Sequence, residues 1–169
     1  MKTVLCSFCL KSGILCQKCS ARLKSGEISQ SDLKIARLLL SLEEKYPPLQ
    51  NVYFHRAVEA GRTLAIIVGA GDVPRLLGYG GRIIKALGEE TGKNIRVLEE
   101  GVDERRFLED LFAPLSIMTI NTIWLPDGST ETRAILRKRR GSQPPFDVNA
   151  LKEIAQKIRG MTLRVEFAD

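Results

Sequence analysis

Apolar and polar positions along the chain follow a pattern that predicts a mixture of helices and strands from residue 29 onward. The segment Ser29 to Asp32 offers helix-capping side chains, and a broad apolar face follows it until Pro47 and Pro48. The periods of the apolar positions and the turn residues predict, in chain order, a helix over 29–42, strands over 52–57 and 63–68, a short helix over 72–78, a helix over 82–91 and a strand over 94–98.

The rest of the chain repeats most of this order. Its clearest turn is Pro126-Asp127-Gly128, which is a strong signal for a hairpin. The pattern predicts a helix over 103–112, strands over 116–125 and 130–137, a helix over 147–158 and a strand over 161–167. The second half therefore resembles the first half with one short helix fewer.

All four cysteines lie in the first 19 residues, where the sequence shows neither helix nor strand periodicity. We expect residues 1–28 to be a small unit that is organised by the cysteines and not by an apolar core. Cys6 and Cys9 form one Cys-x-x-Cys pair, and Cys16 and Cys19 form a second one. Two such pairs can place four thiolates around one tetrahedral ion, which predicts a single structural zinc. An iron–sulfur centre uses the same ligands, and free or disulfide-bonded cysteines are the remaining alternative.

Composition adds a bias towards a polyanionic partner. The 169 residues include 26 Lys and Arg against 20 Asp and Glu, which gives a net charge of +6. The apolar runs are far shorter than the roughly 20 residues that cross a bilayer, and the first residues lack the apolar region of a secretory signal. We therefore expect a cytoplasmic protein without a membrane segment.

A glycine-rich loop lies between two of the predicted helices. Gly78, Tyr79, Gly80 and Gly81 form the pattern Gly-x-x-Gly. Without side chains, such a loop lets a phosphate backbone approach closely, and the helix that follows offers free N–H groups at its positive end. The alternative is a tight turn between helices that binds nothing.

The stretch from Leu76 to Gly92 resembles the signature of KH domains, in which the same loop is followed by Ile and Lys positions and an acidic helix end. The helix before the two strands is similar to the bacterial and archaeal variety, called type II. The resemblance implies that the loop holds about four nucleotides of single-stranded RNA in a groove. Tyr79 stands where the family often has a basic residue, so the positive charge would come from Arg75, Arg82 and Lys85.

The second half has no glycine clamp at the corresponding place, where the sequence is Arg139-Arg140-Gly141-Ser142-Gln143-Pro144-Pro145. A basic cluster stands there instead and would add phosphate contacts, unless it is only a solvated strand end. The cluster consists of Arg137, Lys138, Arg139 and Arg140, with Arg133 nearby. Trp124 could stack on a base, but a lone Trp between Ile123 and Leu125 more often belongs to a core.

The sequence offers little support for catalysis. Gly69-Ala70-Gly71 after a strand is similar to the start of a dinucleotide-binding motif, but Pro74 replaces the third glycine and the helix stops at Gly78. The single histidine, His55, lies in a predicted strand and has no evident catalytic partners. We therefore expect neither an enzyme nor a small-molecule substrate.

Taken together, the sequence predicts an α+β protein with two type II KH-like domains in tandem, 29–101 and 102–169, after a zinc-binding segment, 1–28. Residues from about 30 to the end resemble the tandem KH pair of archaeal NusA-like transcription factors. That resemblance implies an RNA-binding factor of transcription elongation or termination. The alternatives are an adaptor that docks on RNA polymerase or the ribosome through the zinc segment, and a factor of RNA processing or ribosome assembly.

Overall fold

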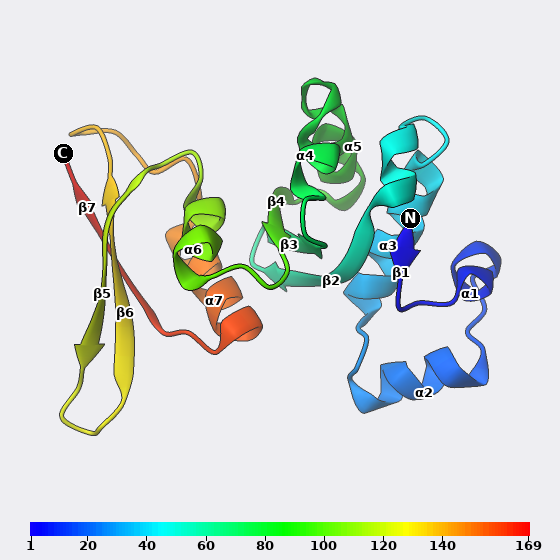
Figure 1. Cartoon of the computed structure of the whole chain (residues 1–169), viewed down its shortest axis with the longest axis horizontal. Coiled ribbons are helices and arrows are strands. Elements are labelled where there is room, and N and C mark those ends of the chain that lie inside the picture. Colours follow the sequence, from blue (N-terminus) through cyan, green and yellow to red (C-terminus); the bar gives the residue numbers. More distant parts are fainter. The chain divides into compact units, whose positions relative to one another are not determined.

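The computed structural model describes residues 1–169, which form two units that each combine helices with one sheet (Figure 1). Unit 1 comprises residues 1–59 and 64–101, and unit 2 comprises residues 60–63 and 102–169. The chain is therefore a mixed α+β protein, as the sequence predicted. None of its helices combines the length and the apolar character needed to span a membrane.

Unit 1 contains a four-stranded sheet in the order β1-β2-β3-β4. Its elements are β1 (Lys2–Thr3), α1 (Ser7–Ser12), α2 (Gln17–Ser25), α3 (Gln30–Leu42), η1 (Pro47–Asn51), β2 (Tyr53–Ala60), β3 (Thr63–Val68), α4 (Val73–Leu77), η2 (Tyr79–Gly81), α5 (Arg82–Thr91) and β4 (Asn94–Glu99). From α3 onward, this order confirms the predicted helices and strands. The C-terminal ends of β3 and β4 lie together, because Glu100 N donates to Val68 O at 2.8 Å.

The core of unit 1 forms around β3, in which all six residues are buried. Asp32 connects α3 to the sheet, because one carboxylate oxygen accepts from Ser29 N at 2.8 Å and the other accepts from Ala57 N at 2.7 Å. The first contact completes a capping box at the start of α3, as the sequence suggested. Apolar residues of α3, the sheet and α5 then pack into one cluster, which includes Ile35, Leu39, Phe54, Ile66, Ile83 and Leu87.

The expectation that the cysteines, and not an apolar core, organise residues 1–28 did not include the apolar contacts of this segment. These residues form one short strand and two helices, and Leu5, Leu10 and Ile28 are buried in the same cluster as α3. β1 pairs parallel to β2, which places Lys2 beside Tyr53. The segment is too short to show a clear apolar period, and its few leucines and isoleucines find their partners in distant parts of the chain.

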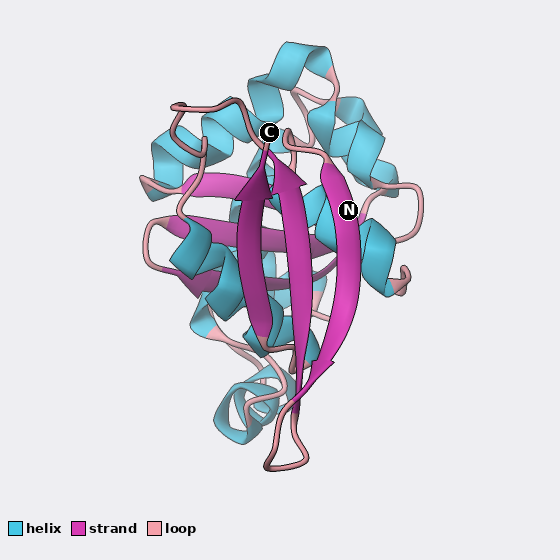
Figure 2. Ribbon diagram, turned by 90° about the vertical axis from the view of Figure 1, so that its left-hand side faces the viewer, coloured by secondary structure: helices cyan, strands magenta, loops and turns pink.

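Unit 2 contains a three-stranded sheet in the order β5-β6-β7. Its elements are α6 (Glu104–Phe112), β5 (Ile117–Trp124), β6 (Thr130–Arg137), α7 (Val148–Arg159) and β7 (Leu163–Ala168). β5 is antiparallel to β6, and β7 is parallel to β6 (Figure 2). The helix–strand–strand–helix–strand order of unit 2 therefore repeats that of α3, β2, β3, α5 and β4, which confirms the predicted internal repeat.

The expectation that Trp124 belongs to the core was wrong, since its side chain is 76% exposed. It lies at the end of β5, opposite Thr130, where the hairpin turns. Most buried apolar residues of unit 2 come instead from α6 and α7, together with Ala134 and Leu136 of β6 and Leu163 of β7. The apolar neighbours Ile123 and Leu125 suggested a core position in the sequence, but Trp124 lies at the exposed end of β5.

Candidate functional site

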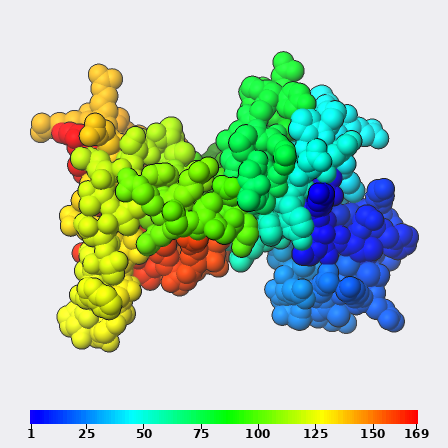
Figure 3. Space-filling view, in the orientation of Figure 1, coloured from blue at the N-terminus to red at the C-terminus, as the bar shows by residue number.

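The glycine loop, Gly78–Gly81, connects α4 and α5 by a tight turn, in which Gly81 N donates to Gly78 O at 3.1 Å. Three consecutive residues have positive φ angles: Tyr79 at 56°, Gly80 at 63° and Gly81 at 79°. None of the four residues is buried, and a Cβ added at Gly80 or Gly81 would meet no atom within 4 Å. The green tip of unit 1 in Figure 3 is this part of the chain. The loop backbone is therefore accessible to a ligand.

An aromatic contact holds the loop on one side. The ring of Tyr79 lies 5.1 Å from the ring of Tyr46, in an edge-to-face arrangement with an interplanar angle of 62°. Tyr46 is buried at the start of η1, and the Lys45 ammonium lies 5.7 Å from the Tyr46 ring. The sequence analysis missed Lys45 and Tyr46, because they lie more than 30 residues before the loop and no local pattern connects them to it.

The start of α5 is positively polarised. No side chain caps its first turn, and that turn contains no acidic residue. Arg82 and Lys85 lie in this first turn, and both are exposed and take part in no ion pair. The helix dipole and these two side chains therefore combine to favour an anion beside the loop.

Arg75 has a different environment from Arg82 and Lys85. Its guanidinium group forms an ion pair with Asp72 and donates to Asn51 O at 3.3 Å. Asp72 is itself buried, and its other carboxylate oxygen accepts from Tyr53 N at 2.8 Å. Arg75 therefore helps to fix α4 against the sheet, and much of its charge is neutralised by Asp72.

The Gly69-Ala70-Gly71 turn lacks the features of a phosphate-binding loop. Gly71 N donates to the Glu99 carboxylate at 2.6 Å, and a Cβ on Gly69 would lie 2.7 Å from an oxygen of Asp72. Two carboxylates thus face the turn, and they would repel a nucleotide phosphate. The helix that follows has only five residues, so it provides a weak dipole.

The basic cluster follows β6, at the end of unit 2 that carries the C-terminus (Figure 3, orange and red). Arg137, Arg139 and Arg140 are exposed. Lys138 is half-buried, because its ammonium donates to Ser142 O at 2.5 Å and lies 5.5 Å from the Phe167 ring. Arg133 is bound to Glu166 by two hydrogen bonds. Three of these five side chains are therefore free to contact phosphates.

The four cysteines occupy equivalent positions in two helices. Cys6 and Cys16 are the N-cap residues of α1 and α2, and Cys9 and Cys19 follow three residues later in the first turn of each helix. Each helix then ends at a glycine with positive φ, Gly13 or Gly26. Each Cys-x-x-Cys pair therefore has the same position at the start of its helix.

The sulfurs of Cys6, Cys9 and Cys16 all lie within 4.8 Å of one another. A tetrahedral ion with metal–sulfur bonds of about 2.3 Å places its ligand sulfurs about 3.8 Å apart, so the cluster has a suitable size. Cys19 lies outside this trio, but it is buried and its thiol interacts with those of Cys9 and Cys16. The arrangement is compatible with a metal site.

The thiols of the cluster differ in acidity. The backbone N–H of Cys19 and then the Cys9 thiol lower the pKa of Cys16 to about 7. At Cys9, the N–H of Cys16 lowers the pKa, but burial and the neighbouring thiols outweigh it and raise the pKa to about 12. In the absence of a cation, Cys16 therefore ionises more readily than Cys9. A bound divalent cation favours the thiolate form of every ligand.

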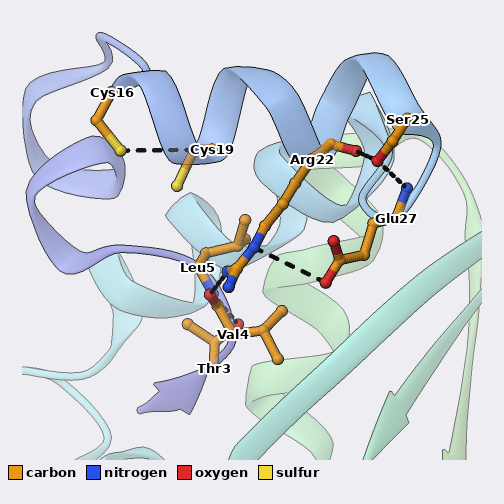
Figure 4. A network of polar contacts seen from close by, with 8 residues as sticks. All are labelled: Thr3, Val4, Leu5, Cys16, Cys19, Arg22, Ser25 and Glu27. Carbon is orange, nitrogen blue, oxygen red and sulfur yellow. Dashed lines mark hydrogen bonds and ion pairs between the residues drawn. The ribbon is translucent and has the colours of Figure 1, made fainter.

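Polar contacts connect the cysteine helices to the rest of unit 1. Arg22 reaches from α2 and donates to Val4 O at 2.6 Å, and it also lies near Glu27 (Figure 4). The N-terminal ammonium group lies 3.2 Å from Glu43, just after α3. The position of the cysteine helices therefore depends on both polar contacts and the buried leucines.

His55, the single histidine, is partly buried in β2 and stacks on Tyr53 with ring centroids 4.4 Å apart. This contact agrees with the expected packing or surface role.

No protein-family model matches this chain. Among curated proteins, it is similar to a protein named probable transcription termination protein NusA from Methanocaldococcus jannaschii. The two are 29% identical over 96 residues, which is 54% of this chain and 51% of the relative. The chain thus spans about half the length of the curated relative that it matches.

Among solved structures, the crystal structure of APE1850 is similar in fold, with a TM-score of 0.54 and 22% sequence identity. The match covers 83% of this chain and 100% of the other one. At this identity the match concerns the fold alone. The sequence similarity, although low, supports a NusA-like relationship for part of the chain.

Proposed function

We propose that this protein is a non-enzymatic RNA-binding factor that acts in transcription elongation or termination and holds single-stranded RNA at the glycine loop of a KH domain. The observation that carries the proposal is the exposed, side-chain-poor backbone of Gly78–Gly81 at the uncapped start of α5. The similarity to a NusA-like protein supports the transcription role.

In this proposal, the backbone of Gly80 and Gly81 lies against the RNA phosphates, because a side chain at either position would occupy the space beside the loop. Arg82 and Lys85 contribute charge from the first turn of α5. Lys45 adds a further cation near the loop. Arg75 acts mainly through its contact with Asp72, which positions α4.

Within the same proposal, 29–101 is the KH domain with the glycine loop, and 102–169 is a second KH-like domain without a clamp. The element order that α6 to β7 repeat from α3, β2, β3, α5 and β4 supports this proposal. Arg137, Arg139 and Arg140 would add phosphate contacts, which strengthen binding without reading the sequence. Cys6, Cys9, Cys16 and Cys19 would hold one structural zinc ion, which stabilises α1 and α2 and takes part in no reaction.

Two double variants test the role of the loop. Gly80→Asp with Gly81→Asp introduces negative charge beside the bound phosphates, and Gly80→Asn with Gly81→Asn is a control of almost the same size and backbone preference. We expect the Asp variant to bind an unpaired oligonucleotide about a hundredfold more weakly than the Asn variant, equal to about 2.8 kcal/mol. Equal affinities in a fluorescence anisotropy titration would contradict the proposal.

A second candidate function is a protein adaptor that docks on RNA polymerase or a ribosomal subunit through the cysteine helices. Three apolar side chains of this segment are exposed: Val4 at 44%, Phe8 at 64% and Ile14 at 71%. In this second proposal, these three side chains form part of the surface that contacts the polymerase or the ribosome. Replacing Phe8 and Ile14 by Ser should abolish a nuclease-resistant pull-down of polymerase or ribosome if this function holds, and should leave RNA affinity unchanged.

A further inference from the structure

The outer strand of the unit 2 sheet, β5, differs from the other edge strands of the protein. Proteins protect exposed sheet edges with charges, prolines or very short strands. β1 has two residues and includes Lys2, β4 contains Arg96 and Glu99, and β7 contains Arg164 and Glu166. β5 has eight residues, from Ile117 to Trp124, and contains neither a charged residue nor a proline.

Five of the eight residues of β5 are exposed, and Ile117, Ile120 and Ile123 are half-buried. None of its residues is buried, although four of them are Ile or Met and one is Trp. Met118 is 40% exposed and Trp124 is 76% exposed. In Figure 2 the sheet of unit 2 faces the viewer, and β5 is the strand farthest from β7. β5 therefore combines an edge position in its sheet with two exposed apolar side chains, Met118 and Trp124.

The backbone of β5 is paired on one side only. It forms a ladder with β6 from Ile117–Leu136 to Trp124–Thr130, with one irregularity between Ile117 and Thr119. In an edge strand, every second residue directs its N–H and C=O groups away from the sheet. These groups are available to a further strand between Thr119 and Trp124.

We propose that β5 pairs with β5 of a second copy of this chain, antiparallel, so that the two unit 2 sheets join into one sheet of six strands. A strand with no charged residues can pair with itself without placing like charges opposite each other. The contact is isologous, so both copies use the same surface and the assembly closes as a dimer.

One register of the two β5 strands allows antiparallel backbone pairing and also brings apolar side chains together. If Asn121 lies on the twofold axis, Thr119 faces Ile123 of the second copy and Ile120 faces Thr122. Each of these pairs lies on one face of the sheet, as antiparallel pairing requires. Met118 then lies near Trp124 of the second copy, where a sulfur–aromatic contact covers two of the most exposed apolar side chains of unit 2.

The charge at this edge favours a second copy over RNA. β5 contains no Lys or Arg, and Asp127 in the adjoining hairpin turn is exposed. The strand itself therefore offers no cation to a phosphate backbone.

Trp124 is the only tryptophan of the chain, so its fluorescence reports on this surface alone. We expect the average mass, measured by sedimentation, to rise towards a dimer with increasing concentration, and the Trp124 emission to shift to shorter wavelength over the same range. Asn121→Lys places two like charges on the twofold axis and should raise the dissociation constant at least tenfold. The control Asn94→Lys, at the charged edge strand β4, should dimerise like the wild type.

Circular dichroism melting checks that Asn121→Lys remains folded, and Thr119→Lys provides a second variant at the same edge if it does not. A wild-type chain that stays monomeric at all accessible concentrations would overturn the proposal. An emission shift that requires added RNA, with no change in mass, would also overturn it, because the edge would then bind RNA and not a second copy.

Discussion

Tyr79 contacts Tyr46 edge to face, at a centroid distance of 5.1 Å, and thereby joins the glycine loop to the segment that follows α3. Tyr79 is the only residue other than glycine with a positive φ angle. A conformation of this kind costs roughly 1–2 kcal/mol for a residue with a Cβ. The aromatic contact, worth about 0.5–1.5 kcal/mol, offsets this cost and fixes the loop.

We therefore expect Tyr79→Ala to destabilise unit 1 by about 1 kcal/mol, because it keeps the strained backbone and loses the ring contact. Tyr79→Gly loses the same contact but relieves the strain, so its stability should lie closer to that of the wild type. Chemical denaturation of the two variants and of Tyr79→Phe measures this order. Equal destabilisation by Ala and Gly would show that the positive φ angle carries no cost.

A second prediction concerns the buried carboxylate of Asp72. Asp72→Ala leaves Tyr53 N without its acceptor and removes the ion pair of Arg75. A buried donor without a partner and a broken, partly buried pair should together cost about 2–4 kcal/mol. Asp169→Ala, at the exposed C-terminus, is the control and should change the unfolding free energy by less than about 0.5 kcal/mol.

Metal removal should affect unit 1 and leave unit 2 intact. Modification of the thiols should release one zinc ion per chain, which a colorimetric assay detects. The Cys9→Ser variant should release no zinc. Free zinc at a hundredfold excess over its dissociation constant should stabilise unit 1 by about 2.7 kcal/mol. Trp124 fluorescence follows unit 2 and should be insensitive to chelation. If the purified protein contains iron or no metal, the proposal of a zinc site at the four cysteines is contradicted.

Local sequence signals predicted much of this structure. The Ser29 to Asp32 cap, the Pro126-Asp127-Gly128 turn and the glycines around α5 each act over a few residues, and each appears where it was expected. The spacing of the cysteines similarly predicted a cluster, because both pairs place their sulfurs within one helical turn.

The features that the sequence did not reveal depend on contacts between distant residues. Tyr46 meets Tyr79, and Leu5 and Leu10 enter the α3 core, although no local pattern links these positions. Arg75 was expected to serve the loop, but the buried Asp72 takes much of its charge. Trp124 resembled a core residue because its neighbours are apolar, and only the tertiary structure places it at an uncovered strand end.

The basic cluster leads to a prediction about salt dependence. Replacing Arg139 and Arg140 by Ala should lower RNA affinity and reduce the slope of log affinity against log salt concentration by about 1.4, if each contacts one phosphate of a single strand. Arg105 and Arg164 are paired with Glu109 and Glu131, so the same double change there is a matched control. A slope that is equal in both double variants would remove the basic cluster from the interface.

The central claim is that RNA lies against the glycine loop. Nuclear magnetic resonance measures this directly, by titrating a short unpaired oligonucleotide into the isotope-labelled protein and following each backbone amide. The account predicts that the largest shifts occur from Gly78 to Lys85, with smaller ones at Arg139 and Arg140. Saturable binding that leaves the amides of Gly80, Gly81 and Arg82 unshifted would contradict it.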